Sequence, residues 1–142
     1  MWAGSWAIND FLKLGKLVPW SVHPMEHELS AYYDITHGAG LAILTPHWMR
    51  HVLNTRTVEK FRTYGVNVWD VPPDLPSMEA AELAIKRTAD YFKALGLPSR
   101  LSEVGIDEKY LEIMAEKSAS RMKGTYAELT KDEILQIFKE AM

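Results

Sequence analysis

The recurrence of apolar residues at intervals of three and four is the feature that most restricts how this chain can fold. It is clearest in SMEAAELAIKRTADYFKALGLPS, residues 77–99. The apolar stripe of this segment consists of Ala81, Leu83, Ala84, Ile85, Thr88, Tyr91 and Phe92. This spacing places the stripe on one face of an α-helix, whereas a strand would alternate apolar and polar residues. Gly96 and Pro98 follow as a stop signal, so we expect an amphipathic helix that ends just before them.

The same periodicity predicts helices along the rest of the chain. We expect them at residues 2–14, 23–33, 38–51, 57–64, 107–122 and 130–142. Ser21 is a suitable N-cap for the second of these helices, and Pro24 falls in its first turn, where a missing N–H is tolerated. Gly65 is a natural C-terminal stop for the fourth. Thr130 and Glu133 have the spacing of a capping box, which predicts the start of the last helix.

Two segments depart from simple helical expectations. Pro46 lies inside the apolar helix at 38–51 and should kink or restart it, because proline lacks a backbone donor. Val66 to Trp69 allows a short extended run, but a lone strand has no partner with which to pair. We therefore predict an all-α fold, a bundle of six or seven helices without a sheet.

Composition narrows the class of protein. With 142 residues, 47% of them apolar and 25% charged, we expect residues 1–142 to form a single globular domain. A net charge of −3 argues against binding to nucleic acid or to an anionic membrane. No apolar run approaches the roughly 18 residues of a membrane span and no signal peptide is evident, so we expect a cytoplasmic location. Without cysteine, any metal must be held by imidazole and carboxylate.

The histidines are confined to one part of the chain. All five fall within residues 21–51, at His23, His27, His37, His47 and His51. The first two and the last two are each four residues apart, so each pair can chelate a divalent cation from adjacent turns of a helix. An isolated histidine is more often structural or simply exposed. Clustering therefore favours a metal site most strongly at the first three.

Two familiar motifs fit this segment poorly. In HPMEH, Pro24 stands where the zinc-protease motif His-Glu-x-x-His has its glutamate, and Glu26, next to His27, is expected to point off the ligand face. HGAG, residues 37–40, suggests a phosphate cradle at a helix N-terminus, but it lacks the third glycine of a dinucleotide fingerprint and follows no strand. We favour the alternative that Gly38 and Gly40 permit close packing around a buried helix.

A longer pattern is more specific than any of these motifs. In HPMEHELSAYYDITHGAGLAILTPHWM, residues 23–49, His37 follows His23 by fourteen positions. This segment resembles the histidine region of the iron-containing, or group III, alcohol dehydrogenases, especially the NAD(P)H-dependent butanol dehydrogenase branch. In that family the motif runs His, three residues, His-Glu-Leu-Ser-Ala, Tyr-Asp, then His-Gly-Ala-Gly-Leu-Ala. The resemblance covers essentially the whole chain, since MWAGSWAINDFLKLGK and ALGLPSRLSEVGID are similar to segments before and after the motif.

The resemblance implies a fold, a site and an activity. It implies an all-helical C-terminal domain that supplies two imidazole ligands to a divalent metal, iron or zinc, and by position these are His23 and His37. His27 matches the family histidine that lies beside the nicotinamide and substrate and has been considered a proton relay. The implied reaction is hydride transfer between NAD(P)H and an aldehyde or primary alcohol.

The family's other two ligands, an aspartate and a histidine, lie in an N-terminal nucleotide-binding domain together with the pyrophosphate loop. These 142 residues contain none of that, so we expect the chain alone to be inactive and to coordinate a cation only in part. A second hypothesis is a helical structural or interaction module without activity, whose exposed apolar surface favours self-association into a homo-oligomer. A third is a non-redox metal-binding protein that combines the 23/27 pair with the 47/51 pair.

Overall fold

A computed structural model of the chain describes residues 2–9, 15 and 20–142. Within these ranges it contains seven α-helices, two short 3-10 helices and no strand, which confirms the all-α prediction. The α-helices are α1 (Trp2–Ile8), α2 (Val22–Tyr33), α3 (His37–Val52), α4 (Val58–Trp69), α5 (Ser77–Ala94), α6 (Leu111–Ala119) and α7 (Lys131–Glu140). The 3-10 helices are η2 (Leu101–Val104) and η3 (Glu108–Tyr110). None of the helices in the described ranges is long and apolar enough to cross a bilayer.

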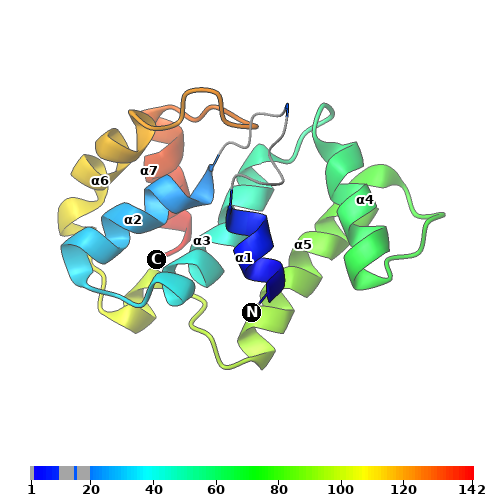
Figure 1. The fold of residues 1–142 in the computed structure, drawn as a ribbon, viewed down its shortest axis with the longest axis horizontal. Helices are drawn as coiled ribbons and strands as arrows, with labels where there is room; N and C mark the ends of the chain where they lie inside the picture. The colour runs from blue at the N-terminus through cyan, green and yellow to red at the C-terminus, as the bar shows by residue number, and fades with distance from the viewer. Residues whose placement is uncertain (1, 10–14, 16–19) are drawn as a thin grey trace.

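Helix α3 runs through the middle of the molecule and separates two groups of helices (Figure 1). It packs against α2 and α7 on one side and against α5 on the other, while α4 packs against α5 and α6 against both α2 and α7. The main core lies around α3 and includes Met25, Leu29, Ile43, Leu44 and Phe138, all at most 1% exposed. Burial of so many large apolar side chains around one helix explains why the α3 sequence is apolar on most faces.

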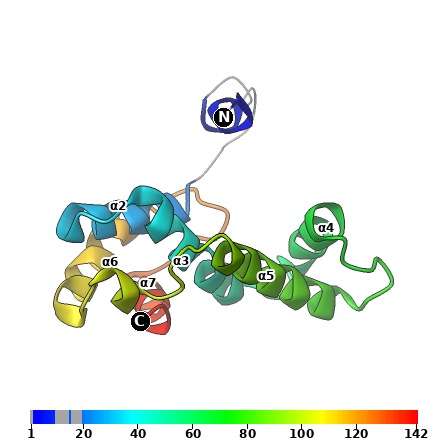
Figure 2. The same ribbon diagram turned by 90° about the horizontal axis from the view of Figure 1, so that it is seen from below.

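Helix α1 lies apart from the other helices, on the side of the molecule where α2 is found (Figure 2). Its apolar side chains are unusually accessible, with Trp2 80% and Ile8 60% exposed. The predicted helix at residues 2–14 is confirmed for residues 2–8, and its second half falls on residues 10–14, outside the described part of the chain.

Helix α4 corrects two expectations. It continues through Gly65 to Trp69, so Gly65 is not a stop and residues 66–69 are helical rather than extended. A Cβ added at Gly65 would lie 2.9 Å from Ala84 Cβ and 3.2 Å from the Ala80 carbonyl oxygen. Gly65 therefore serves the close approach of α4 to α5, and tertiary packing overrides its preference for helix ends.

Helix α3 corrects a third expectation. Pro46 lies inside one continuous helix, so it does not restart the helix there, and it is buried. The helix begins one residue earlier than predicted, at His37, with Thr36 at the N-cap position. Only residues 34–36 separate it from α2, which ends where Asp34 adopts a left-handed conformation with φ of 52°. This tight connection holds the end of α2 and the start of α3 together.

Other end signals behave as predicted. Gly96, with φ of 78°, closes α5, and the N–H groups of Gly96 and Leu97 donate to the carbonyl oxygens of Lys93 and Phe92. Thr130 and Glu133 form the capping box of α7, each side chain accepting from the backbone N–H of the other. Ser21 occupies the N-cap position of α2 but makes no side-chain capping bond there.

Candidate metal centre

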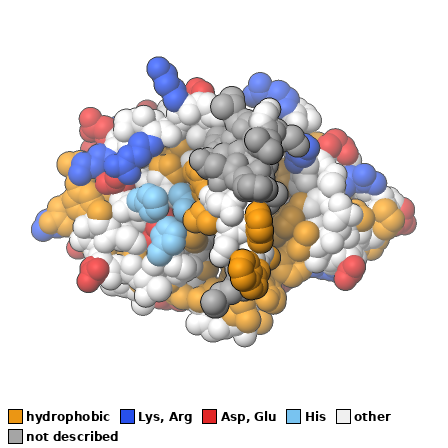
Figure 3. All heavy atoms as spheres, in the orientation of Figure 1, with side chains coloured by type: hydrophobic (Ala, Val, Ile, Leu, Met, Phe, Trp, Pro, Cys, Tyr) orange, Lys and Arg blue, Asp and Glu red, His pale blue; other side chains and the backbone are white. Residues whose placement is uncertain are grey.

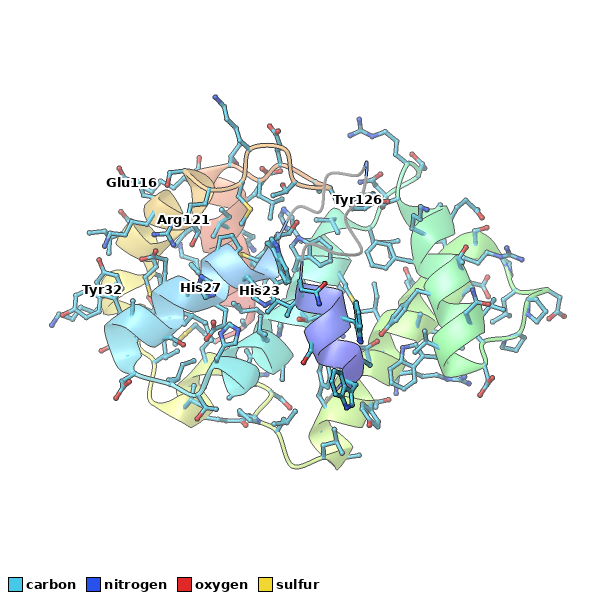
Figure 4. All side chains as sticks on the ribbon, in the orientation of Figure 1. His23, His27, Tyr32, Glu116, Arg121 and Tyr126 are labelled. Atoms are coloured by element: carbon cyan, nitrogen blue, oxygen red, sulfur yellow. The ribbon has the colours of Figure 1, made fainter. Side chains whose placement is uncertain are left out.

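Three imidazole rings meet where α2 faces the start of α3. Ring centroids of His23 and His37 are 5.2 Å apart, those of His27 and His37 are 5.4 Å apart, and those of His23 and His27 are 5.9 Å apart. His23 and His27 project from one face of α2 because they are four residues apart (Figure 4). His37 enters from the first residue of α3. The structure therefore brings together all three histidines that the sequence analysis selected.

These separations suit a shared cation. Two imidazole ligands of one tetrahedral ion, each with a nitrogen–metal distance of about 2.1 Å, have ring centroids about 5 Å apart. The 5.2 Å between His23 and His37 matches this value without movement of either helix. The distance between His27 and His37 is nearly as suitable, so ring spacing alone does not decide which two of the three are ligands. Two or three protein nitrogens leave coordination positions open for further ligands.

A buried carboxylate lies beneath the imidazoles. Glu26 is 0% exposed, and one of its oxygens contacts Nδ1 of His37. The ligand atoms of Glu26, His27 and His37 all lie within 4.8 Å of one another. The expectation that Glu26 points off the ligand face is therefore wrong. Its position three residues after His23 was the available signal, because residues three apart share a helix face.

Gly40 makes room for this carboxylate. A Cβ at Gly40 would lie 2.7 Å from Cγ and 2.9 Å from Oε1 of Glu26. Gly38, by contrast, is exposed, and a Cβ there would meet nothing within 4 Å. The prediction that glycines in this motif permit close packing is thus correct for Gly40 and wrong for Gly38.

His23 is the most enclosed of the three rings. The Trp20 indole makes a T-shaped contact with it, with ring centroids 4.4 Å apart and planes inclined by 72°. Burial, followed by the neighbouring imidazoles of His37 and His27, lowers the pKa of His23 from its usual value. A lowered pKa favours the neutral imidazole, which is the form that binds a metal.

The rings line an open cavity of about 480 Å³. Ile8 and Trp20 supply apolar walls, and Arg121 supplies a positive charge. The histidines form a patch on the molecular surface beside apolar side chains (Figure 3). The buried Glu28 fixes the guanidinium of Arg121, since the two charged groups approach to 3.0 Å. Arg121 was not predicted from the sequence, because it is 94 residues from His27 and no local motif connects them.

The remaining two histidines lie elsewhere on α3. His47 is ten residues beyond His37, about 15 Å along a helix, and lines a different cavity with Arg50, Arg100 and Glu140. Burial, followed by the charge of Arg50, lowers the pKa of His47.

His51 lies one turn further along α3, where its Nε2 atom is 3.9 Å from Glu133. The structure therefore does not combine the 23/27 pair with the 47/51 pair, as the third hypothesis requires.

Comparison with known protein families identifies the class to which this helical chain belongs. Residues 2–142 match the family described as Fe-containing alcohol dehydrogenase family, C-terminal. The chain belongs to this family.

Individual curated proteins are also similar to this chain. The chain is 56% identical over 146 residues to NADH-dependent butanol dehydrogenase B of Clostridium acetobutylicum, covering 100% of the chain and 37% of the relative. It is 53% identical over 144 residues to NADH-dependent butanol dehydrogenase A of the same organism, covering 99% of the chain and 37% of the relative. The chain thus spans 37% of the length of these curated relatives.

Solved structures agree with this assignment. The structure of Escherichia coli YqhD superimposes with a TM-score of 0.87 at 28% identity, covering 100% of this chain and 37% of that one. The NADH-dependent butanol dehydrogenase A of Thermotoga maritima superimposes with a TM-score of 0.83 at 27% identity, covering 99% of this chain and 37% of that one. The whole described fold is therefore that of the C-terminal part of these proteins.

Proposed function

We propose that this chain is the metal-binding, C-terminal part of an NAD(P)-dependent alcohol dehydrogenase that interconverts an aldehyde and a primary alcohol. The observation that supports this most directly is the convergence of His23 and His37, fourteen residues apart, with ring centroids separated by 5.2 Å. Similarity to the two Clostridium acetobutylicum butanol dehydrogenases points to NADH and to a short-chain alcohol such as butanol.

In this proposal residues 1–142 form a single all-α domain that docks on an N-terminal nucleotide-binding domain. That domain would supply the remaining ligands, including a carboxylate that offsets the charge of the cation. His23 and His37 would hold a divalent metal, iron or zinc. A cytoplasmic location and self-association into a homo-oligomer, both expected from the sequence, are parts of the same proposal.

Each side chain has a separate task in the reaction. When bound, a divalent cation polarises the carbon–oxygen bond of the substrate, which favours hydride transfer to or from the nicotinamide. Trp20 packs against His23, and burial lowers the pKa of this ring, which favours its neutral form. His27 has an exposed ring that also lines the cavity, so it can exchange protons with solvent on one side and with the substrate oxygen on the other.

The test uses the natural gene product that contains this chain. Metal content and the reduction of butanal with NADH and with NADPH would be measured for the wild type and for three histidine variants. We expect His23→Ala and His37→Ala each to lose bound metal and activity together. His27→Ala should keep its metal and lose about 10²- to 10⁴-fold in kcat, because only proton transfer is impaired.

His47→Ala is the matched control, since it changes a histidine of α3 outside the cluster. It should retain both metal and activity. A wild-type protein that holds metal but reduces no aldehyde with either nicotinamide would show that the proposed activity is wrong. Loss of metal in His47→Ala would instead revive the hypothesis of a non-redox metal-binding protein.

A further inference from the structure

Glu26 is out of place as a structural residue. It is a carboxylate without exposed surface, and no lysine or arginine of the described chain forms an ion pair with it. Burying a charge is costly unless specific donors satisfy it. Both of its oxygens have such donors: Ser30 Oγ donates to Oε1, and Nδ1 of His37 contacts Oε2. A buried carboxylate held in this way is weak evidence for a stabilising role, so we look for a functional one.

We propose that Glu26 is a positioning residue that fixes the tautomer and orientation of His37 and so presents Nε2 of that ring to the metal. This inference rests on the proposed metal site and adds a role for a residue next to it. A carboxylate can only accept a hydrogen bond, so the contact with Nδ1 requires the proton to be on Nδ1. The lone pair is then on Nε2, on the opposite side of the ring.

The surroundings of the two groups support this geometry. The side chain of His37 is 47% exposed while Glu26 is fully enclosed, so the ring has one buried edge and one edge open to the cavity. Only the open edge is accessible to an ion that has other ligands. Histidines that bind metals commonly donate their second ring N–H to a carboxylate, which orients the ring and raises its basicity.

The packing holds the carboxylate itself in place. Ser30 is four residues after Glu26 on the same helix, so its hydroxyl can donate to the second oxygen. Gly40 leaves room for the Glu26 side chain, because any Cβ there would come within 2.7 Å of Cγ. With both oxygens engaged and no exposure, the carboxylate is poorly placed to act as a ligand in its own right.

Metal affinity is the first test, measured by zinc titration against a competing chelator on the metal-depleted natural gene product. We expect Glu26→Ala to weaken zinc binding about 10- to 100-fold, as loss of such partners does. Glu26→Gln should restore most of the affinity, because an amide oxygen still accepts from Nδ1–H. Thr88→Val is the control, because it removes a buried hydrogen-bonding group on α5, outside the cavity, and should leave zinc affinity unchanged.

The second readout is the ring of His37, followed by NMR of protein labelled with ¹⁵N-histidine. In the wild type and in Glu26→Gln, the proton should reside on Nδ1; in Glu26→Ala, the neutral ring should shift towards the Nε2–H form. This readout separates positioning from general destabilisation, since Thr88→Val perturbs a buried polar group without changing the tautomer of His37. If the alanine variant does not fold, the tautomer of His37 can still be measured in the wild type and in Glu26→Gln.

Two results would overturn the inference. The first is an unchanged zinc affinity in a folded Glu26→Ala protein, provided that His37→Ala does lose zinc. The second is a Glu26 oxygen in the coordination sphere of zinc, seen by X-ray absorption or in a zinc-bound crystal structure. Glu26 would then be a ligand. If His37→Ala also retained zinc, the failure would belong to the proposed metal site and not to Glu26 alone.

Discussion

Gly40 and Glu26 form a complementary pair, in which the missing side chain of one residue creates the space for the other. The Cβ of any larger residue at position 40 would meet Cγ of Glu26 at 2.7 Å and Cδ1 of Ile35 at 3.1 Å. At the level of single residues, the identity of position 40 is therefore set by a neighbour fourteen positions earlier and not by helix geometry.

Gly40→Ala should therefore destabilise the protein by about 1–3 kcal/mol, because the new methyl group must displace a buried side chain. It should also weaken metal binding by shifting Glu26. Gly38→Ala is the control on the same turn, since its Cβ meets nothing within 4 Å and alanine is the better helix former by up to about 1 kcal/mol. Urea unfolding checks both variants, and equal stability of the two would contradict the packing argument.

Residue types and spacing were enough to select His23, His27 and His37, because residues four apart share a helix face and the family pattern links the third to the first. Spacing also places Glu26 near the face of His23, three residues away, but it does not predict the contact with His37. Whether a glutamate beside a histidine points inward depends on the direction from which the next helix arrives. That direction is set by the left-handed Asp34 and the short connection after it, which are properties of the folded chain.

At the scale of helices, amphipathic patterns located most elements correctly, while interior glycine and proline misled the prediction. Gly65 resembles a stop in the sequence, yet it serves contact between α4 and α5. Pro46 resembles a break, yet it is buried inside α3. In both cases packing between helices outweighs a local preference of about 1–3 kcal/mol. The capping box of α7 was predictable because both of its partners are local in sequence.

The same capping box makes the stability of α7 depend on pH. Hydrogen bonds from the Thr130 backbone N–H and hydroxyl lower the pKa of Glu133 from its ordinary value of 4.5. The folded pKa lies below the unfolded one, so this stabilisation is complete above about pH 4.5 and is lost as the pH falls through the lower folded value.

Glu133→Gln should therefore cost about 0.5–1 kcal/mol at pH 7 and less at pH 3, because the carboxylate gains a proton as the pH falls through its folded pKa. Urea unfolding at the two pH values measures this difference. Glu116→Gln, at an exposed position of α6, serves as the control and should show no such dependence. A stability difference that is the same at both pH values would mean that the charge of Glu133 contributes nothing.

At the scale of the whole molecule, the apolar surface of α1 is unusually exposed to solvent. Trp2, Trp6 and Ile8 are 80%, 44% and 60% exposed, and Ile8 also lines the cavity of the histidines. Large apolar surfaces of this kind mark interaction sites. The chain spans 37% of the length of its relatives, and we expect the part of such a protein outside this chain to pack against α1.

We expect the 142-residue chain, prepared alone, to self-associate through α1. Trp2→Ser combined with Ile8→Ser should lower the association constant at least tenfold, because burial of each side chain contributes about 1.5–3 kcal/mol. Sedimentation equilibrium at several concentrations provides the measurement. Val68→Ser, which changes an exposed apolar residue on α4, is the control and should associate as the wild type does. Unchanged association in the double variant would assign self-association to another surface.

The three-residue connection between α2 and α3 also bears on the order in which the molecule assembles. His23 and His37 are close in sequence, so the chain entropy lost when their helices meet is small compared with that of contacts between α2 and α6. This helical hairpin is therefore expected to form early during synthesis, before α7 has left the ribosome. The N-terminal domain that would carry the other ligands is synthesised before this hairpin, so metal could be bound as soon as the hairpin docks on that domain.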